Sequence, residues 1–299
     1  MAGSEPGSDE ALTKEEIQGS SETPSTGEKR KNACSCLPII HLTLPPRSAM
    51  THNSNFLYAV TALMAPRKKP ETPARSTGGN PFKDRMGLGA YLADPSSLPC
   101  SVVVSHDADF VVIRDKYPKA TVHLLILPRS PAISLLHPFD ALADPSFLTL
   151  VRAAAARARS LAAAELQRLL GPHSAAEAAR QAVLDGADGE LPRGRDWEAE
   201  VMVGVHAVPS MRHLHVHVVS RDMRSEALRH RKHYNSFNTP FLVPLADFPL
   251  AGGDERRDPR GRGYMRRPLR CWRCGRDFGD RFARLKEHLE EEFEAWRRE

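Results

Sequence analysis

Residues 210–220 read Ser-Met-Arg-His-Leu-His-Val-His-Val-Val-Ser, so a histidine stands at every second position: His213, His215 and His217. In an extended strand, successive side chains point to opposite faces of the sheet. The three imidazoles therefore share one face, spaced about 7 Å apart along the strand. Leu214 and the valines that alternate with the histidines take the other face and can enter a core. The segment predicts a strand that is apolar on one face and chemically active on the other.

Two bland causes of the alternation stay open. Imidazoles are common metal ligands, and a polar strand face can be rich in histidine without further meaning. The flanking residues favour a different chemistry, because Pro209, Ser210 and Met211 precede a pattern of histidines alternating with apolar residues. This arrangement resembles the motif of the histidine-triad superfamily of nucleotide hydrolases and transferases. Within that superfamily the segment most resembles the aprataxin family, whose members remove AMP from adenylated DNA 5′ ends.

The composition, at 299 residues, leaves room for one mid-sized domain and a smaller module. The formal net charge of +5 permits nucleic-acid binding without requiring it. Positive charge gathers between residues 256 and 286, where twelve Lys and Arg stand against three Asp, a local excess of nine. Five cysteines do not suggest a disulfide scaffold, and we find neither a signal peptide nor an apolar run long enough to cross a bilayer. We therefore expect an intracellular protein without membrane association.

Residues 1–79 are mostly Ser, Glu, Pro, Lys and Gly, a composition that buries too little apolar surface to offset the entropy of ordering. We expect a disordered tail, in which residues 56–64 could form a short helix. Basic clusters at residues 29–31 and 67–69 are candidates for a nuclear import signal or for nonspecific phosphate contacts. A plain solvated charge run explains either cluster equally well.

From about Pro81 onward the sequence pattern predicts an α+β domain. Apolar residues recur at helical spacing in the longest predicted helix: Phe147, Leu150, Val151 and Leu161. The predicted elements are helices at 86–92 and 145–170, strands at 101–104, 110–114, 121–127, 198–208 and 210–220, and an insertion at 171–196 with a helix at 175–184. The resemblance implies that residues 80–248 adopt the histidine-triad fold, an antiparallel sheet with one long packed helix.

Adenylate chemistry at a histidine needs an unprotonated imidazole to attack phosphorus, groups that hold the phosphate oxygens, and a seat for the nucleoside. We predict His215 as the nucleophile, because it has an imidazole on each side along its own face. One of its ring nitrogens must keep a lone pair, so the other should donate to a backbone carbonyl or a similar acceptor. The resemblance implies a covalent adenylyl-histidine that water then cleaves. It also implies that His213 supports the strand and that His217 binds the non-bridging phosphate oxygens.

A second segment, Val-Ile-Arg-Asp-Lys-Tyr-Pro-Lys-Ala-Thr-Val-His at residues 112–123, resembles a stretch of aprataxin-like proteins. The resemblance implies that Asp115 accepts from the ribose hydroxyls and that Lys119 and His123 approach the phosphoryl group. Taken alone, Asp115 is typical of a turn or cap and His123 of a hydrogen-bonded core histidine. The resemblance adds four residues to the predicted nucleotide- and DNA-binding set: His206, Ser210, Met211 and Ser220.

A third segment, residues 230–238, reads His-Arg-Lys-His-Tyr-Asn-Ser-Phe-Asn and also resembles aprataxin-like proteins. The resemblance implies that Lys232 and His233 contact a DNA 5′ phosphate, while amide and hydroxyl groups hold the backbone. An ordinary polar loop is the alternative.

The C-terminal region, residues 249–299, predicts a linker and a small metal-binding module. Cys271 and Cys274 form a Cys-x-x-Cys pair, and His288 and Glu292 lie one turn apart on a predicted helix at 282–296. These four ligands would complete a structural Zn²⁺ site with no open position. Fungal aprataxins resemble the chain in placing Glu where a second His is usual. Glu291 is within reach as an alternative ligand, and a reduced pair without metal or with redox chemistry stays open.

Seven arginines surround this module and suit a phosphate backbone: 266, 267, 270, 273, 276, 281 and 284. The resemblance therefore implies a nuclear DNA-repair enzyme, a hydrolase that releases AMP from adenylated DNA or RNA–DNA 5′ ends. It implies structural zinc and no catalytic metal. Two other functions stay open, namely a hydrolase of small adenylated compounds such as dinucleoside polyphosphates, and a non-catalytic zinc-finger protein that senses adenylates on DNA.

Overall fold

The computed structural model describes residues 85–299. The predicted disordered tail, its helix at 56–64 and its two basic clusters lie outside the described residues, as does the predicted start of order near Pro81. Within residues 85–299, no helix has both the length and the hydropathy that crossing a bilayer requires.

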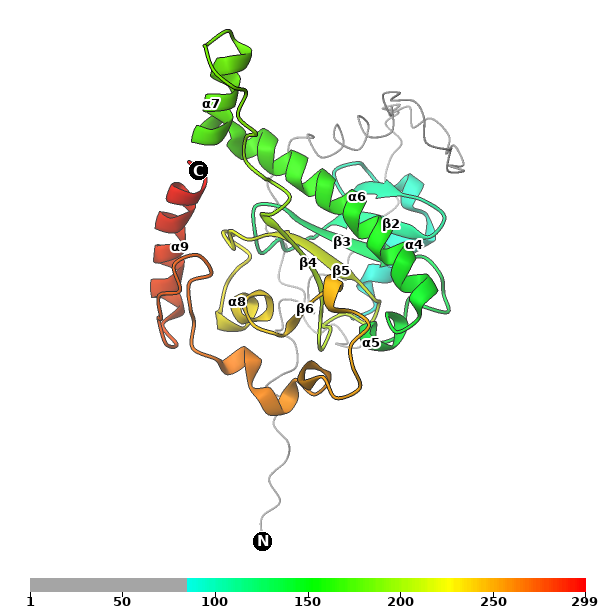
Figure 1. Ribbon diagram of the computed structural model, residues 1–299. Helices are drawn as coiled ribbons and strands as arrows, with labels where there is room; N and C mark the ends of the chain where they lie inside the picture. The colour runs from blue at the N-terminus through cyan, green and yellow to red at the C-terminus, as the bar shows by residue number, and fades with distance from the viewer. Residues whose placement is uncertain (1–84) are drawn as a thin grey trace, which may run out of the picture.

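Six strands form one sheet in the order β1-β2-β3-β5-β4-β6, and every neighbouring pair is antiparallel (Figure 1). The strands are β1 (Val103–His106), β2 (Phe110–Arg114), β3 (His123–Pro128), β4 (Val201–His206), β5 (Val216–Ser220) and β6 (Leu242–Pro244). The predicted α+β fold with an antiparallel sheet is confirmed. Strand β6, at the edge beside β4, was missed because three residues are too few to show an alternating pattern.

The longest helix, α6 (Pro145–Leu170), lies across one face of the sheet (Figure 1). It begins where Asp144 accepts hydrogen bonds from the first-turn amides and Pro145 occupies the first helical position. Its alanines let the helix approach closely, so that Ala158 and Ala162 join the core with Ile126 and other strand side chains. The predicted bounds of this helix are confirmed. Leu150, predicted to share the apolar stripe, is instead 48% exposed.

Alternation along the three central strands sorts the side chains between the two faces. Leu124, Val205 and Val218 belong to the core beneath α6. Their neighbours in sequence, including His123, His206 and His217, therefore face away from the helix. The histidines of three adjacent strands are thus brought to the same side of the sheet.

Strand β5 is shorter than the predicted strand at 210–220, because the backbone before Val216 bonds to other segments. The Leu214 amide donates to the carbonyl of Ser134, and the Arg212 amide donates to that of Arg85. Of the three motif histidines, only His217 lies within the strand. His213 and His215 therefore do not follow the alternation that defined the motif.

Shorter helices complete the domain. The predicted helix at 86–92 is a 3₁₀ turn, η1, followed by α4, and the segment 230–238, for which the sequence left a polar loop open, forms α8. The bounds are η1 (Gly87–Gly89), α4 (Ala90–Ala93), α5 (Pro138–Ala141), α7 (Ala175–Leu184), α8 (Arg231–Asn238) and α9 (Phe282–Trp296). Helices α7 and α9 have the predicted bounds.

The C-terminal region packs on the domain through α8 and through the insertion. Tyr234 of α8 donates its hydroxyl to the Arg270 carbonyl at 2.7 Å and accepts from the Trp272 amide at 2.9 Å. At the far end of α9, Trp296 is buried, and the guanidinium of Arg195 stacks 4.7 Å from its ring centroid. Two separate contacts therefore fix α9 on the rest of the chain.

Candidate active site

Four imidazoles form one buried cluster on the sheet face opposite α6. The ring centroid of His217 lies 5.2 Å from that of His123, 4.3 Å from His206 and 4.9 Å from His215. Phe237 of α8 covers the cluster, with its ring 4.8–5.3 Å from three of the four. The spacing is shorter than the 7 Å expected along one strand, since the members come from different strands.

Burial sets the charge of these imidazoles, since transfer from water disfavours the protonated form. It lowers the pKa of His123 to about 4 and the pKa values of His206 and His217 well below the ordinary 6.5. Burial also lowers the pKa of His215. Mutual repulsion between the rings and the nearby Lys119 adds to the effect at the first three. The cluster is therefore neutral near pH 7.

His215 is oriented by its own backbone. Its Nδ1 lies 2.7 Å from the carbonyl oxygen of His213, which can only accept, so Nδ1 carries the hydrogen. In the neutral ring the lone pair is then on Nε2. The predicted arrangement of one donating and one unprotonated nitrogen is therefore present in the structure.

A relay of hydrogen bonds fixes the tautomers of two further rings. The Lys119 amide donates to Nδ1 of His123 at 3.2 Å, so the hydrogen of this ring is on Nε2. That Nε2 lies 3.0 Å from Nδ1 of His217, which must therefore accept. Neutral His217 consequently carries its hydrogen on Nε2, a buried atom without a hydrogen-bond partner among residues 85–299. The relay leaves a donor that a bound oxygen could satisfy.

Asp115 and Lys119 border the cluster from the β2–β3 connection. An oxygen of Asp115 accepts from the Tyr117 amide at 2.7 Å, and the other lies 3.6 Å from Nε2 of His123. The aspartate thus holds a turn and also faces the imidazoles. Lys119 is only 6% exposed, and its Nζ donates to the Tyr117 carbonyl at 2.9 Å.

The remaining predicted residues lie at varying distances from the cluster. His213 packs its ring against Gly89, where an added Cβ would lie 2.8 Å from the imidazole. Ser210 accepts from Arg85 Nε through its carbonyl at 3.0 Å, and Met211 packs near η1. Ser220 is at the other end of β5, where its hydroxyl bonds to Asp222, so the structure does not bring it to the imidazoles.

Helix α8 places His233 and Lys232 differently. His233 is buried and accepts the Arg229 amide on Nδ1 at 3.1 Å, and burial lowers its pKa to about 3, with Lys119 as the next cause. Lys232 is partly exposed on the same helix. No sequence motif pointed to Phe237, although its position three residues after Tyr234 places it one helical turn from a buried aromatic.

The predicted metal ligands converge in the C-terminal region. The donor atoms of Cys271, Cys274, His288 and Glu292 all lie within 4.8 Å of one another. Cys274 Sγ is 3.1 Å from Nε2 of His288, and a Glu292 oxygen is 3.2 Å from the same nitrogen. Glu291 faces Nδ1 instead and is 79% exposed, so the structure selects Glu292. Two thiols, one imidazole and one carboxylate fit a tetrahedral Zn²⁺ ion.

Comparisons with known proteins agree with both sites. Residues 238–295 match the family "C2HE / C2H2 / C2HC zinc-binding finger", and residues 92–233 match "Scavenger mRNA decapping enzyme C-term binding". A solved aprataxin ortholog, Hnt3 in complex with DNA, is 30% identical, with a TM-score of 0.57 over 71% of this chain and 96% of that one. Fold and site thus define a histidine-triad protein with a C-terminal zinc-binding finger.

Curated relatives narrow this class. The aprataxin-like protein of Schizosaccharomyces pombe is 31% identical over 82% of this chain and 96% of its own length. That of Saccharomyces cerevisiae is 34% identical over 71% of this chain and 96% of its own length. The chain belongs to the aprataxin family.

Proposed function

We propose that the chain is a DNA-repair hydrolase that removes AMP from the 5′ ends of adenylated DNA or RNA–DNA and leaves a 5′-phosphate. The observation that carries the proposal is the pair of aligned tautomers, a lone pair on His215 Nε2 beside a buried, unpartnered N–H on His217 Nε2. Membership of the aprataxin family and the likeness to a structure solved with DNA support the substrate class. A repair enzyme with this substrate would act in the nucleus.

The first step forms a bond from His215 Nε2 to the phosphorus of the adenylyl group and breaks the anhydride bond. The 5′-phosphate of the nucleic acid leaves with the bonding electron pair. The His217 N–H donates to a non-bridging oxygen, where negative charge develops. Positive charge on the adenylated ring of His215 is stabilised by its Nδ1–H bond to the His213 carbonyl.

The second step breaks the phosphorus–nitrogen bond. Water attacks phosphorus, AMP leaves with the water oxygen, and the proton that water releases passes to solvent. His215 returns to its neutral form with the lone pair on Nε2. Neither step uses a metal ion, so omission of divalent cations should leave the rate of AMP release unchanged. Zinc in the finger would supply folding energy rather than chemistry.

The direct test is release of AMP from an adenylated nick by the His215→Ala variant. We expect the rate to fall roughly 10³-fold or more, as when a nucleophile is removed from a cooperative site. Binding of the nicked DNA should change little, because the imidazole is buried beneath the contact surface. His173→Ala, which removes an exposed histidine of the insertion, is the matched control. Near-normal turnover by His215→Ala would refute the nucleophile assignment.

A further inference from the structure

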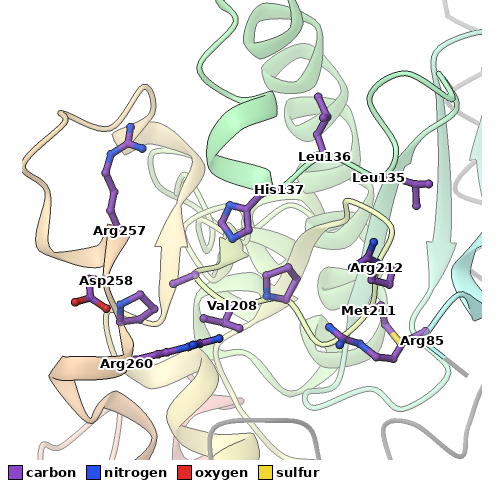
Figure 2. Close-up of a pocket in the computed structure, with 13 residues that line it drawn as sticks. Arg85, Leu135, Leu136, His137, Val208, Met211, Arg212, Arg257, Asp258 and Arg260 are labelled. Carbon is purple, nitrogen blue, oxygen red and sulfur yellow. The ribbon is translucent and has the colours of Figure 1, made fainter. Parts of the chain in front are cut away.

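A cavity of about 500 Å³ lies beside the histidine cluster (Figure 2). Its walls come from residues 135–137, from the loop 207–212 and from the linker at 257–260, with Arg85 at one side. The loop 207–212 directly joins His206 at the end of β4 to His213. The cavity is therefore adjacent to the proposed site, and no sequence motif pointed to its charged residues.

The charge of the cavity walls is strongly positive. Arg85, Arg212, Arg257 and Arg260 line it against a single carboxylate, Asp258. In the part of the chain that the structure describes, none of these five side chains is joined to another charged group by an ion pair. Arg257 is held by the carbonyls of residues 250 and 251, which satisfy its nitrogens but do not neutralise it. Three net positive charges are therefore available to an anion.

Two of the arginines face each other across the opening. Figure 2 shows Arg260 extending from the linker toward Val208, while Arg212 and Arg85 lie on the opposite wall. Arg212 and Arg260 are exposed, and neither side chain has a hydrogen bond to residues 85–299. Guanidinium groups in this arrangement suit phosphate oxygens, which accept several N–H donors at once.

Apolar surface borders the charge. Leu135 and Leu136 are 48% and 44% exposed at the rim, and Val208 and Pro209 contribute to the wall between the arginines. A free inorganic anion would gain nothing from such surface. A polynucleotide does gain from it, because sugars and base faces alternate with its phosphates.

The linker wall of the cavity is fixed to the catalytic part of the chain. Asn235 of α8 donates to the Arg267 carbonyl at 2.9 Å, a short distance along the chain from Arg260. The same helix carries Phe237 over the histidines and Tyr234 against the finger. In Figure 1, α5, which follows residues 135–137, lies on the opposite side of β6 from α9. The cavity is thus a cationic surface separate from the arginines of the finger.

We infer that this cavity binds the phosphodiester backbone of the polynucleotide substrate next to the adenylated end, an inference that rests on the proposed function. It makes polynucleotide adenylates better substrates than small ones through contacts that the finger does not supply. Arg212 and Arg260 hold a phosphate, and the exposed leucines support the adjoining sugar or base.

The test compares kinetics on an adenylated DNA nick with kinetics on a dinucleoside polyphosphate. The double variant Arg212→Ala/Arg260→Ala should raise KM for the nick by roughly tenfold or more and leave kcat unchanged, because charged groups that meet the backbone act in binding. The slope of log KM against log salt should fall by about one for each phosphate that the variant no longer binds. Kinetics on the dinucleoside polyphosphate should not change.

Two further variants separate recognition from folding. Asp258→Asn removes the one negative charge of the cavity and should lower KM for the nick, a gain that a merely structural residue would not produce. Arg221→Ala removes an exposed arginine at the other end of β5 and should change nothing. Unchanged KM and salt slope in the double variant would overturn the inference. So would weaker inhibition by AMP with an unchanged KM for DNA, which would make the cavity a mononucleotide site.

Failure of the proposed function gives a different result. If the wild-type chain released no AMP from the adenylated nick, that function would be wrong, and the same variants would be measured by equilibrium binding of a non-adenylated nick. Weaker binding by the double variant alone would still support the cavity, and equal binding by all variants would reject it.

Discussion

The chain contains two compact groups of ligand-type side chains whose residue types overlap but whose chemistry differs. In the finger, Cys271, Cys274, His288 and Glu292 converge within 4.8 Å, and Asp115, His123 and His217 satisfy the same geometric condition in the catalytic part. The second group already bonds internally, His123 to His217, and is backed by the hydrogen bond of His123 to the Lys119 amide. The first offers two thiols, which bind Zn²⁺ as thiolates. The neighbours of an imidazole, more than its spacing in the sequence, decide whether it holds a metal or attacks phosphorus.

The largest expected effect breaks the finger and spares the cluster. Cys271→Ser should abolish zinc binding, which in isolated fingers provides about 10–16 kcal/mol of apparent folding energy at neutral pH. We expect loss of bound zinc and of hydrogen-exchange protection in α9. Cys100→Ser, at an exposed free cysteine, is the control and should keep both. If Cys271→Ser retained one zinc per chain, the ligand set would be wrong.

The next effect concerns the donor on His217. His217→Phe keeps an aromatic ring but removes the N–H that would meet the developing charge, so kcat should fall roughly 10²–10³-fold. KM should change far less, and the measurement is AMP release under saturating adenylated DNA. A variant that instead lost a bound metal ion would turn the histidine cluster into a metal centre and remove the contrast between the two groups.

Acid distinguishes the buried imidazoles by stability. The pKa of His123 is lowered to about 4, whereas an unfolded histidine titrates near 6.5. Below pH 6.5 the unfolded chain takes up a proton that the folded chain refuses. The folded state therefore keeps its full stability above pH 6.5 and loses about 3 kcal/mol through this residue as the pH falls toward 4.

Denaturant unfolding at pH 7.5 and pH 5, with zinc in excess, measures this loss. The His123→Gln variant is the internal control, because it should lose less stability over the same interval. Equal losses in the two proteins would show that His123 is protonated in the folded state. The kcat/KM profile should likewise stay flat from pH 8 down to 6.5, since His215 is already neutral there.

The smallest effect tests the scaffold that holds the cluster. Gly204 pairs with both His217 and Pro244, and an added Cβ would lie 2.5 Å from the Val243 carbonyl oxygen. Gly204→Ala should therefore destabilise the fold by about 1–3 kcal/mol through forced separation of β4 and β6. Gly252→Ala, where nothing lies within 4 Å, should stay within about 0.5 kcal/mol of wild type. Matching stabilities in denaturant titrations would show that β6 is not needed.

Local patterns predicted the parts of the fold that carry strong periodicity. The alanine-rich helix at 145–170 and the helix at 282–296 have the predicted bounds, because each shows a continuous apolar stripe. The strand at 210–220 was overextended, since its first half bonds to Ser134 and Arg85, which are distant in sequence. Leu150 shows the same limit, because helical spacing cannot tell which side of a stripe faces the sheet.

The candidate site was predictable where one motif contained it and was missed where several segments meet. His215 and the four zinc ligands lie within two short motifs. Phe237, which covers three imidazoles, belongs to α8 and reaches them only through tertiary packing. The arginine-lined cavity combines four separate segments, so neither composition nor spacing could reveal it. The family resemblance pointed to Ser220, yet its hydroxyl bonds to Asp222 at the far end of β5.

The most direct measurement is a single-turnover reaction with adenylated DNA, quenched in alkaline denaturant because phosphorus–nitrogen bonds to histidine are labile in acid. We predict a transient chain that is heavier by one adenylyl group, with fragmentation placing the group on His215. The adduct should be absent from the His215→Ala variant. An adduct on another side chain, or full AMP release by that variant, would contradict the role of this imidazole as the nucleophile.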